Sequence, residues 1–203
     1  MKKLYIILAV LVLIALPVGG LYYIYKNTAP AVYKARDLGI RFTNAELTAA
    51  QTKLDNILTG KQSQAAFDSR ELTALLVEES RKGAPVFDPQ VKVNKDDTIE
   101  VSGLLAMKRI ETMAKNDKSL EDVVFYLGTG HDVPIYARFK GTVDDGHGRL
   151  KIMQLNMNDS DLPNGLVSEN QGGIVDMLDQ ELSNAGISSI TAKNGLLTIQ
   201  KAP

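Results

Sequence analysis

The residues best suited to chemistry in this 203-residue chain are its two histidines, each of which lies beside carboxylates. His131 precedes Asp132 after a Gly-Thr-Gly run, and His147 follows Asp144 and Asp145. An imidazole with carboxylates can bind Zn²⁺ or act as a general base. Neither histidine has a partner at the i,i+4 spacing of a helical zinc site, and the Gly-Thr-Gly run lacks the third glycine of a dinucleotide-binding loop. We therefore interpret both segments as exposed turns, and we predict no metal and no cofactor.

The acidic segments do not form a recognisable site either. The run from Asn156 to Asp161 is rich in oxygen ligands, but an EF-hand needs Gly where Asp161 stands and Glu where Val167 stands. Glu78-Glu79 and Asp96-Asp97 are adjacent pairs, whereas a glycosidase needs two carboxyl groups that face one bond. The chain contains no Cys, which excludes disulfides, thiolate metal sites and a catalytic cysteine. We predict no catalytic residue and expect that the protein is not an enzyme.

The N-terminal segment is the strongest signal in the sequence. Residues 4–25 form a run of 22 residues without a charged side chain, preceded by Lys2 and Lys3 and followed by Lys26. A helix of this length spans about 33 Å, enough to cross a hydrocarbon core of roughly 30 Å. Tyrosines gather at its far end, where aromatic rings favour the headgroup layer. The residues that we assign to this membrane anchor include Leu4, Ile14, Leu21, Tyr22, Tyr23 and Tyr25.

A cleaved signal peptide is the alternative reading of this segment, with a small-residue site at Val18-Gly19-Gly20. We favour the uncleaved anchor because a mature chain would otherwise begin with the exposed apolar run that starts at Leu21. The Met-Lys-Lys start resembles a bacterial export signal. Both readings place the rest of the chain outside the cytoplasm, in the periplasm or at the cell surface. We expect an anchor over 1–26, a linker over 27–39 and an extracytoplasmic domain over 40–203.

The exported part has the size and charge of an ordinary globular domain. Beyond residue 25 the chain has 178 residues with 21 basic and 24 acidic side chains, a net charge of −3. That length is sufficient for one hydrophobic core. The mild negative charge gives no reason to expect nucleic-acid binding.

Helix signals recur along this domain. Thr43 and Asp68 are each followed three residues later by Glu, which is the pattern of a capping box at a helix start. Apolar residues at helical spacing follow both caps, and Gly60 ends the first helix. Further helices are predicted over 107–114, 120–127 and 174–182, the last ending at Gly186.

Strand signals alternate with these helices. Short strands are expected at 40–42 and 64–67, and period-two alternation predicts a hairpin over 91–101, a second hairpin over 133–156 and a third over 187–200. The third turns at Asn194-Gly195, a sequence that favours a type I′ turn. The fold class is therefore α+β, with a largely antiparallel, curved sheet packed against amphipathic helices.

The chain resembles a known group of proteins. The resemblance is carried by the anchor, by the helix starts at 42–47 and 68–76, by the strand at 99–103, and by the strand, loop, helix and hairpin from 155 onward. The members of this group are bacterial membrane-anchored extracytoplasmic proteins of unknown function whose domains are similar to tubular lipid-binding folds. The resemblance implies a non-enzymatic envelope role, with a lipid or another hydrophobic ligand as the partner. A protein-interaction module of a membrane-bound assembly and an envelope hydrolase using His131 or His147 are the alternatives.

Overall fold

The computed structural model of the protein describes residues 34–115, 131–144, 147–157, 160–161, 175, 179 and 182–202. The predicted membrane anchor, with Leu4, Ile14, Leu21 and the tyrosines that follow, lies outside these residues, as does the helix predicted over 120–127. Within the described ranges, no helix is both long and apolar enough to cross a membrane.

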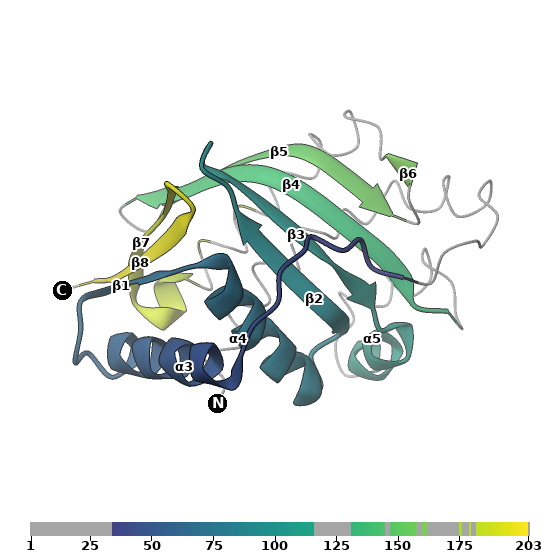
Figure 1. The fold of residues 1–203 in the computed structure, drawn as a ribbon, viewed down its shortest axis with the longest axis horizontal. Coiled ribbons are helices and arrows are strands. Elements are labelled where there is room, and N and C mark those ends of the chain that lie inside the picture. Colours follow the sequence, from purple (N-terminus) through teal and green to yellow (C-terminus); the bar gives the residue numbers. More distant parts are fainter. Residues whose placement is uncertain are drawn as a thin grey trace.

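The described elements form an α+β domain built on one sheet (Figure 1). The helices with described bounds are α3 (Asn44–Leu58), α4 (Ser69–Arg81) and α5 (Met107–Ala114). The strands are β1 (Gln64–Phe67), β2 (Val86–Val93), β3 (Thr98–Leu105), β4 (Val133–Asp144), β5 (His147–Met157), β6 (Ser160–Asp161), β7 (Ile187–Lys193) and β8 (Leu196–Lys201). Every pairing among these strands is antiparallel, which confirms the predicted fold class and sheet type.

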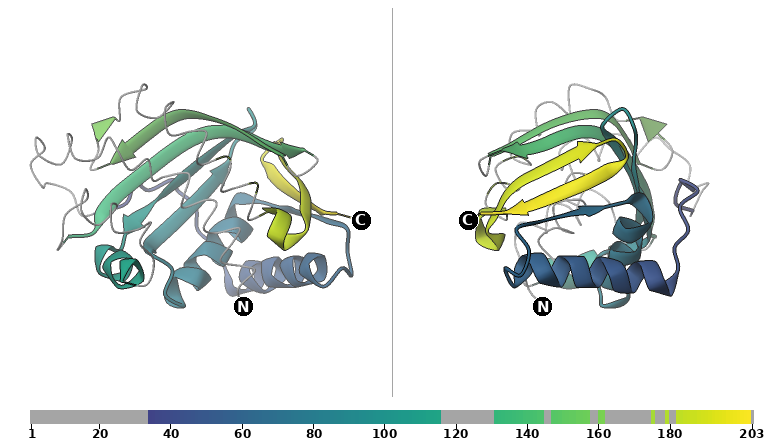
Figure 2. Two further views of the ribbon diagram at one scale, coloured as in Figure 1. Left: turned by 180° about the vertical axis from the view of Figure 1, so that it is seen from behind. Right: turned by 60° about the vertical axis from the view of Figure 1, so that its left-hand side comes forward.

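Strand β4 is the centre of the sheet. It pairs with β3 along one side and with β5 along the other, and its last residues also pair with β7 at Thr142 and Val143. The strand order β1-β8-β7-β4-β3-β2 leaves the sheet open, and β5 carries β6 on its far side. The long strands β4 and β5 bend over the rest of the domain, so the sheet is strongly curved (Figure 2).

The two faces of the sheet have different chemistry because side chains alternate along each strand. One face, here called the inner face, carries buried apolar residues such as Val101 of β3 and Phe139 of β4. It belongs to one core cluster with apolar residues of the helices, including Leu72 and Leu76 of α4. The opposite or outer face carries polar residues of the same strands, namely Glu100, Ser102, Tyr136 and Arg138.

Both predicted capping boxes are present. The Thr43 N–H donates to Glu46 Oε2 at 2.6 Å, and the Glu46 N–H donates to Thr43 Oγ1 at 3.3 Å. At α4 the Asp68 N–H donates to Glu71 Oε2 at 3.1 Å, and the Glu71 N–H donates to Asp68 Oδ1 at 2.9 Å. Each box satisfies N–H groups that have no partner within their own helix.

Other boundaries also agree with the sequence pattern. The helix predicted over 107–114 is α5, and the hairpin turn at Asn194-Gly195 has positive φ at both residues, as a type I′ turn requires. Residues 182–185 are helical, and Gly186 follows with φ 67°. The expected strand at 64–67 is β1.

Helix α4 protects the free edge of β2, beside which it lies (Figure 1). The Thr73 hydroxyl accepts the Val91 N–H at 2.9 Å and donates to the Val91 carbonyl at 3.2 Å. The Ser69 hydroxyl accepts the Val93 N–H at 2.9 Å. Pro89, in a bulge of the same strand, has no N–H to satisfy. These features prevent another strand from pairing with this edge.

The strand predicted at 40–42 is wrong. Residues 34–42 instead form an extended segment, here called the strap, which crosses the outer face without pairing to a strand (Figure 1). Its backbone is held by a side chain, because the Leu38 and Ile40 N–H groups both donate to Gln90 Oε1, at 2.9 and 3.3 Å. The Arg36 guanidinium lies 4.1 Å from the centre of the Tyr136 ring. The residues from 34 to 39, expected as linker, are thus in contact with the domain.

Candidate functional site

The two histidines do not share a site. His131 is exposed just before β4, and His147 begins β5 just after β4 ends. Because β4 has 12 residues, it separates them by roughly 40 Å along the strand. The His147 side chain is 84% exposed and lies 3.6 Å from an Asp179 oxygen. No group of three potential metal-ligating side chains occurs among the residues that the structure describes.

The acidic pairs singled out in the sequence do not face one another. Glu79 is buried and binds Lys82 at 2.9 Å, while Glu78 lies 3.6 Å from Arg81 and from Lys82. These contacts place the pair at the C-terminal end of α4, where cations stabilise the helix.

Asp96 has a structural role in the β2–β3 turn. Its carboxylate accepts the Thr98 hydroxyl at 2.6 Å and an Arg138 N–H at 2.9 Å. The hydrogen bonds from Thr98, followed by the charge of Arg138, lower the pKa of this carboxyl. It therefore stays ionised near neutral pH and is unsuited to donating a proton. Its neighbour Asp97 has φ 66° at the exposed tip of the turn.

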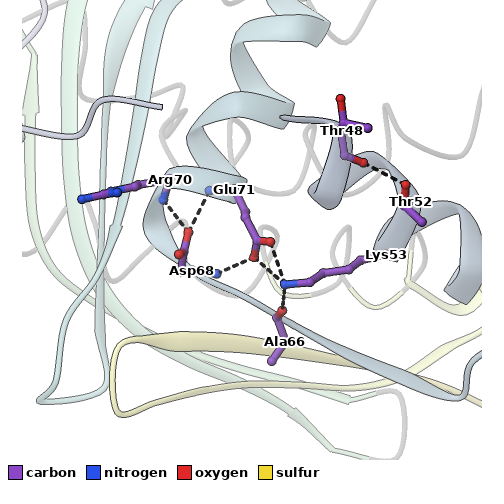
Figure 3. A network of polar contacts seen from close by, with 7 residues as sticks. All are labelled: Thr48, Thr52, Lys53, Ala66, Asp68, Arg70 and Glu71. Carbon is purple, nitrogen blue, oxygen red and sulfur yellow. Dashed lines mark hydrogen bonds and ion pairs between the residues drawn. The ribbon is translucent and has the colours of Figure 1, made fainter. Parts of the chain in front are cut away.

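A polar network that was not predicted from the sequence joins α3, β1 and α4 (Figure 3). The Lys53 ammonium donates to both Glu71 carboxylate oxygens at 2.7 Å and to the Ala66 carbonyl at 2.9 Å. A second pair runs between the same helices, from Arg70 to Glu46 at 3.1 Å. Each capping glutamate is therefore held by a cation of the other helix. Since every strong acceptor already has a partner within the network, we assign it a structural role.

The best candidate for a binding site is a hollow of about 620 Å³ at the α5 end of the domain. We call it the α5 hollow. Its lining is apolar at Phe87, Leu104, Ala106 and Met107, and polar at Lys108, Arg109, His131 and Asp132. Phe87 and Leu104 are paired neighbours on β2 and β3, and both are half-buried. The hollow thus combines an apolar surface with a cluster of basic groups.

Arg109 fixes the geometry of this hollow. Its Nη1 donates to the Ser80 and Ala84 carbonyls, both at 2.6 Å, and its guanidinium lies 4.2 Å from the centre of the Phe87 ring. Both acceptors are carbonyl oxygens, so these hydrogen bonds bring no negative charge to the guanidinium. Asp132, the one acid of the lining, accepts the Met107 N–H at 3.3 Å and so caps the start of α5.

A second hollow of about 490 Å³ lies beside the strap, and we call it the strap hollow. It shares Leu104 with the α5 hollow and is lined by strap residues that include Lys34, Asp37 and Arg41. Asp37 and Arg41 form a two-contact ion pair at 2.7 and 2.9 Å. This pair, together with the Gly39 N–H, holds the pKa of Asp37 far below its usual range. Asp37 is therefore already neutralised, whereas Asp88, the second acid of this lining, is exposed and forms no ion pair with another described residue.

This arrangement suits binding of an amphiphile better than bond-breaking chemistry. Apolar side chains with a few placed polar groups are typical of small-molecule sites, and unneutralised cations at the edge favour an anionic group. No local sequence pattern links Phe87, Leu104 and Arg109, because they come from three different elements, so the sequence did not predict this site. Met107 and Met157 are buried in the core, whereas Met153 is 46% exposed on β5.

Comparison with known proteins adds no family to this description. A scan against models of protein families matches none of them to the chain, and a search of curated proteins returns no significant match.

Proposed function

We propose that this protein is a membrane-anchored, extracytoplasmic and non-enzymatic domain that binds a lipid or another hydrophobic ligand in the cell envelope. The α5 hollow carries this proposal, because it joins an apolar lining to basic groups within about 620 Å³. Ligand pockets for small molecules commonly measure about 300–1,000 Å³. The charge-free span at 4–25 supports the anchor, since its length matches the hydrocarbon core.

The position of the α5 hollow relative to the two faces of the sheet decides where a ligand would bind. Phe87 and Leu104 belong to the half-buried residues that alternate with the buried core residues Val86 and Leu105. The α5 hollow therefore lies on the outer side of the β2–β3 hairpin. The inner face of β3 and β4 packs its apolar side chains into the core cluster. We accordingly place the ligand against the outer side.

A comparison of lipid content between two tryptophan variants tests the proposal. The full chain is purified in a mild non-ionic detergent, and co-purified lipid per protein is measured by mass spectrometry. Leu104→Trp fills the α5 hollow, while Leu196→Trp places the same side chain at an exposed position on β8, outside the lining. We expect Leu104→Trp to lose most of the bound lipid and Leu196→Trp to retain it.

Two results would count against the proposal. Equal lipid content in both variants would mean that the lipid surrounds only the anchor. Absence of lipid from the wild-type chain, together with one protein retained in stoichiometric amount, would favour the interaction module instead. The hydrolase alternative needs only one of the two histidines, so it is tested by replacing both His131 and His147 with Ala, which should abolish function if that alternative is correct.

A further inference from the structure

We propose that the α5 end of the domain faces the membrane in which the chain is anchored and rests on anionic phospholipid headgroups. This inference rests on the proposed anchor at 4–25 and adds to it an orientation and a lipid class. Its basis is the position at which the chain enters the domain, together with the distribution of charge around that position.

The chain between the proposed anchor and the described domain is short. Only the eight residues 26–33 separate Tyr25 from Lys34. An extended chain covers at most about 3.5 Å per residue, so the nine residue-to-residue steps from Tyr25 to Lys34 reach at most about 32 Å. Whatever path these residues take, Lys34 therefore lies within roughly 30 Å of the membrane surface, which is about the diameter of a small domain.

The strap fixes the position of Lys34 on the domain. Gln90 accepts two strap N–H groups, and Arg36 stacks on Tyr136, so the strap is attached to β2 and β4. Lys34 lines the strap hollow, and that hollow shares Leu104 with the α5 hollow. The tether thus leaves the domain beside the α5 hollow. The strands β1, β7 and β8 lie at the other end of the molecule (Figure 1).

Basic side chains gather around the two hollows. Lys34 lines the strap hollow, and Lys108 and Arg109 line the α5 hollow. In the described part of the chain, none of these three has a carboxylate partner within 4 Å. Three acids line the two hollows: Asp37 binds Arg41, Asp132 caps α5, and Asp88 is exposed. Against them stand the four cations Lys34, Arg41, Lys108 and Arg109, which leaves a net charge of +1 around the hollows, whereas the chain beyond residue 25 carries −3. This end is therefore more basic than the domain as a whole and attracts a surface of anionic headgroups.

The absence of native cysteine allows this orientation to be measured with single labels. Thr112→Cys puts a fluorophore on the exposed side of α5, and Lys193→Cys puts one at the exposed β7–β8 turn at the other end. Each full chain is reconstituted into nanodiscs that contain a headgroup-labelled quencher lipid, with and without phosphatidylglycerol. We expect several-fold stronger quenching at position 112 than at 193, and only in discs that contain phosphatidylglycerol. Added salt should weaken it.

Two pairs of charge-reversal substitutions, one at the hollows and one away from them, test the role of the basic residues. Lys34→Glu with Lys108→Glu should remove most of the quenching at position 112. Lys61→Glu with Lys95→Glu changes the net charge equally at exposed positions outside both hollows and should leave the quenching unchanged.

The possible failures are distinguishable. A chain that does not co-elute with nanodiscs would overturn the anchor, and with it this inference. A chain that co-elutes but is quenched equally at 112 and 193 would overturn the orientation while leaving the anchor intact. Equal quenching in discs with and without phosphatidylglycerol, or no effect of the Lys34 and Lys108 reversal, would overturn the role of anionic headgroups.

Discussion

At the level of single residues, the Lys53–Glu71 pair is the contact on which the packing of α3 against α4 depends most directly. Glu71 is buried, and it also closes the α4 capping box by accepting the Asp68 N–H. The side chain of Lys53 is 38% exposed, so solvent screens part of the attraction.

We expect Lys53→Met to destabilise the fold by about 1–3 kcal/mol, because it leaves the buried Glu71 carboxylate without its cation. Glu71→Gln keeps the cap and removes the charge, so Lys53→Met should cost less in that background. Thermal unfolding of the four chains of this double-mutant cycle, in detergent, measures the coupling. Lys61→Met, at an exposed position, is the control. Strictly additive effects would contradict the assigned role.

A second residue-level prediction concerns alkaline pH. Burial, and then the hydrogen bond to Glu100, raise the pKa of Tyr136. Because the folded state favours the neutral phenol, this stabilisation is complete below the unfolded pKa of about 10 and is lost as the pH rises through the raised folded value. The melting temperature should therefore fall more steeply above about pH 10 in wild type than in Tyr136→Phe. Since other groups titrate in both chains, parallel curves would exclude Tyr136 as the cause.

These residue-level roles were only partly predictable. The capping interactions of Thr43 and Asp68 were predicted because both partners lie within three residues of each other. The pairing of Glu71 with Lys53 was not, because the two residues are 18 positions apart and meet only when α3 packs on α4.

At the level of elements, the contact between α4 and the β2 edge can be tested by removing one hydroxyl group. Thr73→Val keeps the shape of the side chain but removes the hydroxyl that satisfies both polar groups of Val91. We expect it to destabilise the fold by about 1–3 kcal/mol, and we expect faster hydrogen exchange of the Val91 amide. Thr73→Ser keeps the hydroxyl and should retain most of the protection of that amide. Equal exchange rates in the two variants would show that α4 does not cap this edge.

The elements also show where sequence patterns succeed. The three hairpins were predicted because alternation and turn residues are local signals. The alternation of apolar and charged residues at 40–42 is typical of a strand, but this part of the strap pairs with no strand. Its N–H groups at 38 and 40 are satisfied by the Gln90 side chain instead, 52 and 50 residues away, which no local pattern reveals.

At the level of the whole molecule, the least predictable features are the ones that join distant parts of the chain. Strand β1 pairs with β8, more than 120 residues later, and β4 pairs with three different strands. The α5 hollow depends on that assembly, since its lining comes from β2, from the end of β3, from α5 and from the residues before β4. The sequence therefore supported the fold class and most elements, but not the candidate site.

The membrane topology can be tested on the whole chain in cells. A Lys193→Cys chain expressed in a bacterium is treated with a membrane-impermeant maleimide, before or after permeabilisation. If the domain is extracytoplasmic, the exposed position 193 should be labelled fully in intact cells. If residues 4–25 remain as the anchor, the labelled chain should keep its full-length mass and stay in the membrane pellet after alkaline extraction. Labelling that requires permeabilisation would place the domain in the cytoplasm. A shortened, extractable chain would instead establish cleavage near Val18-Gly19-Gly20, and the α5 end would then have no tether to hold it against the bilayer.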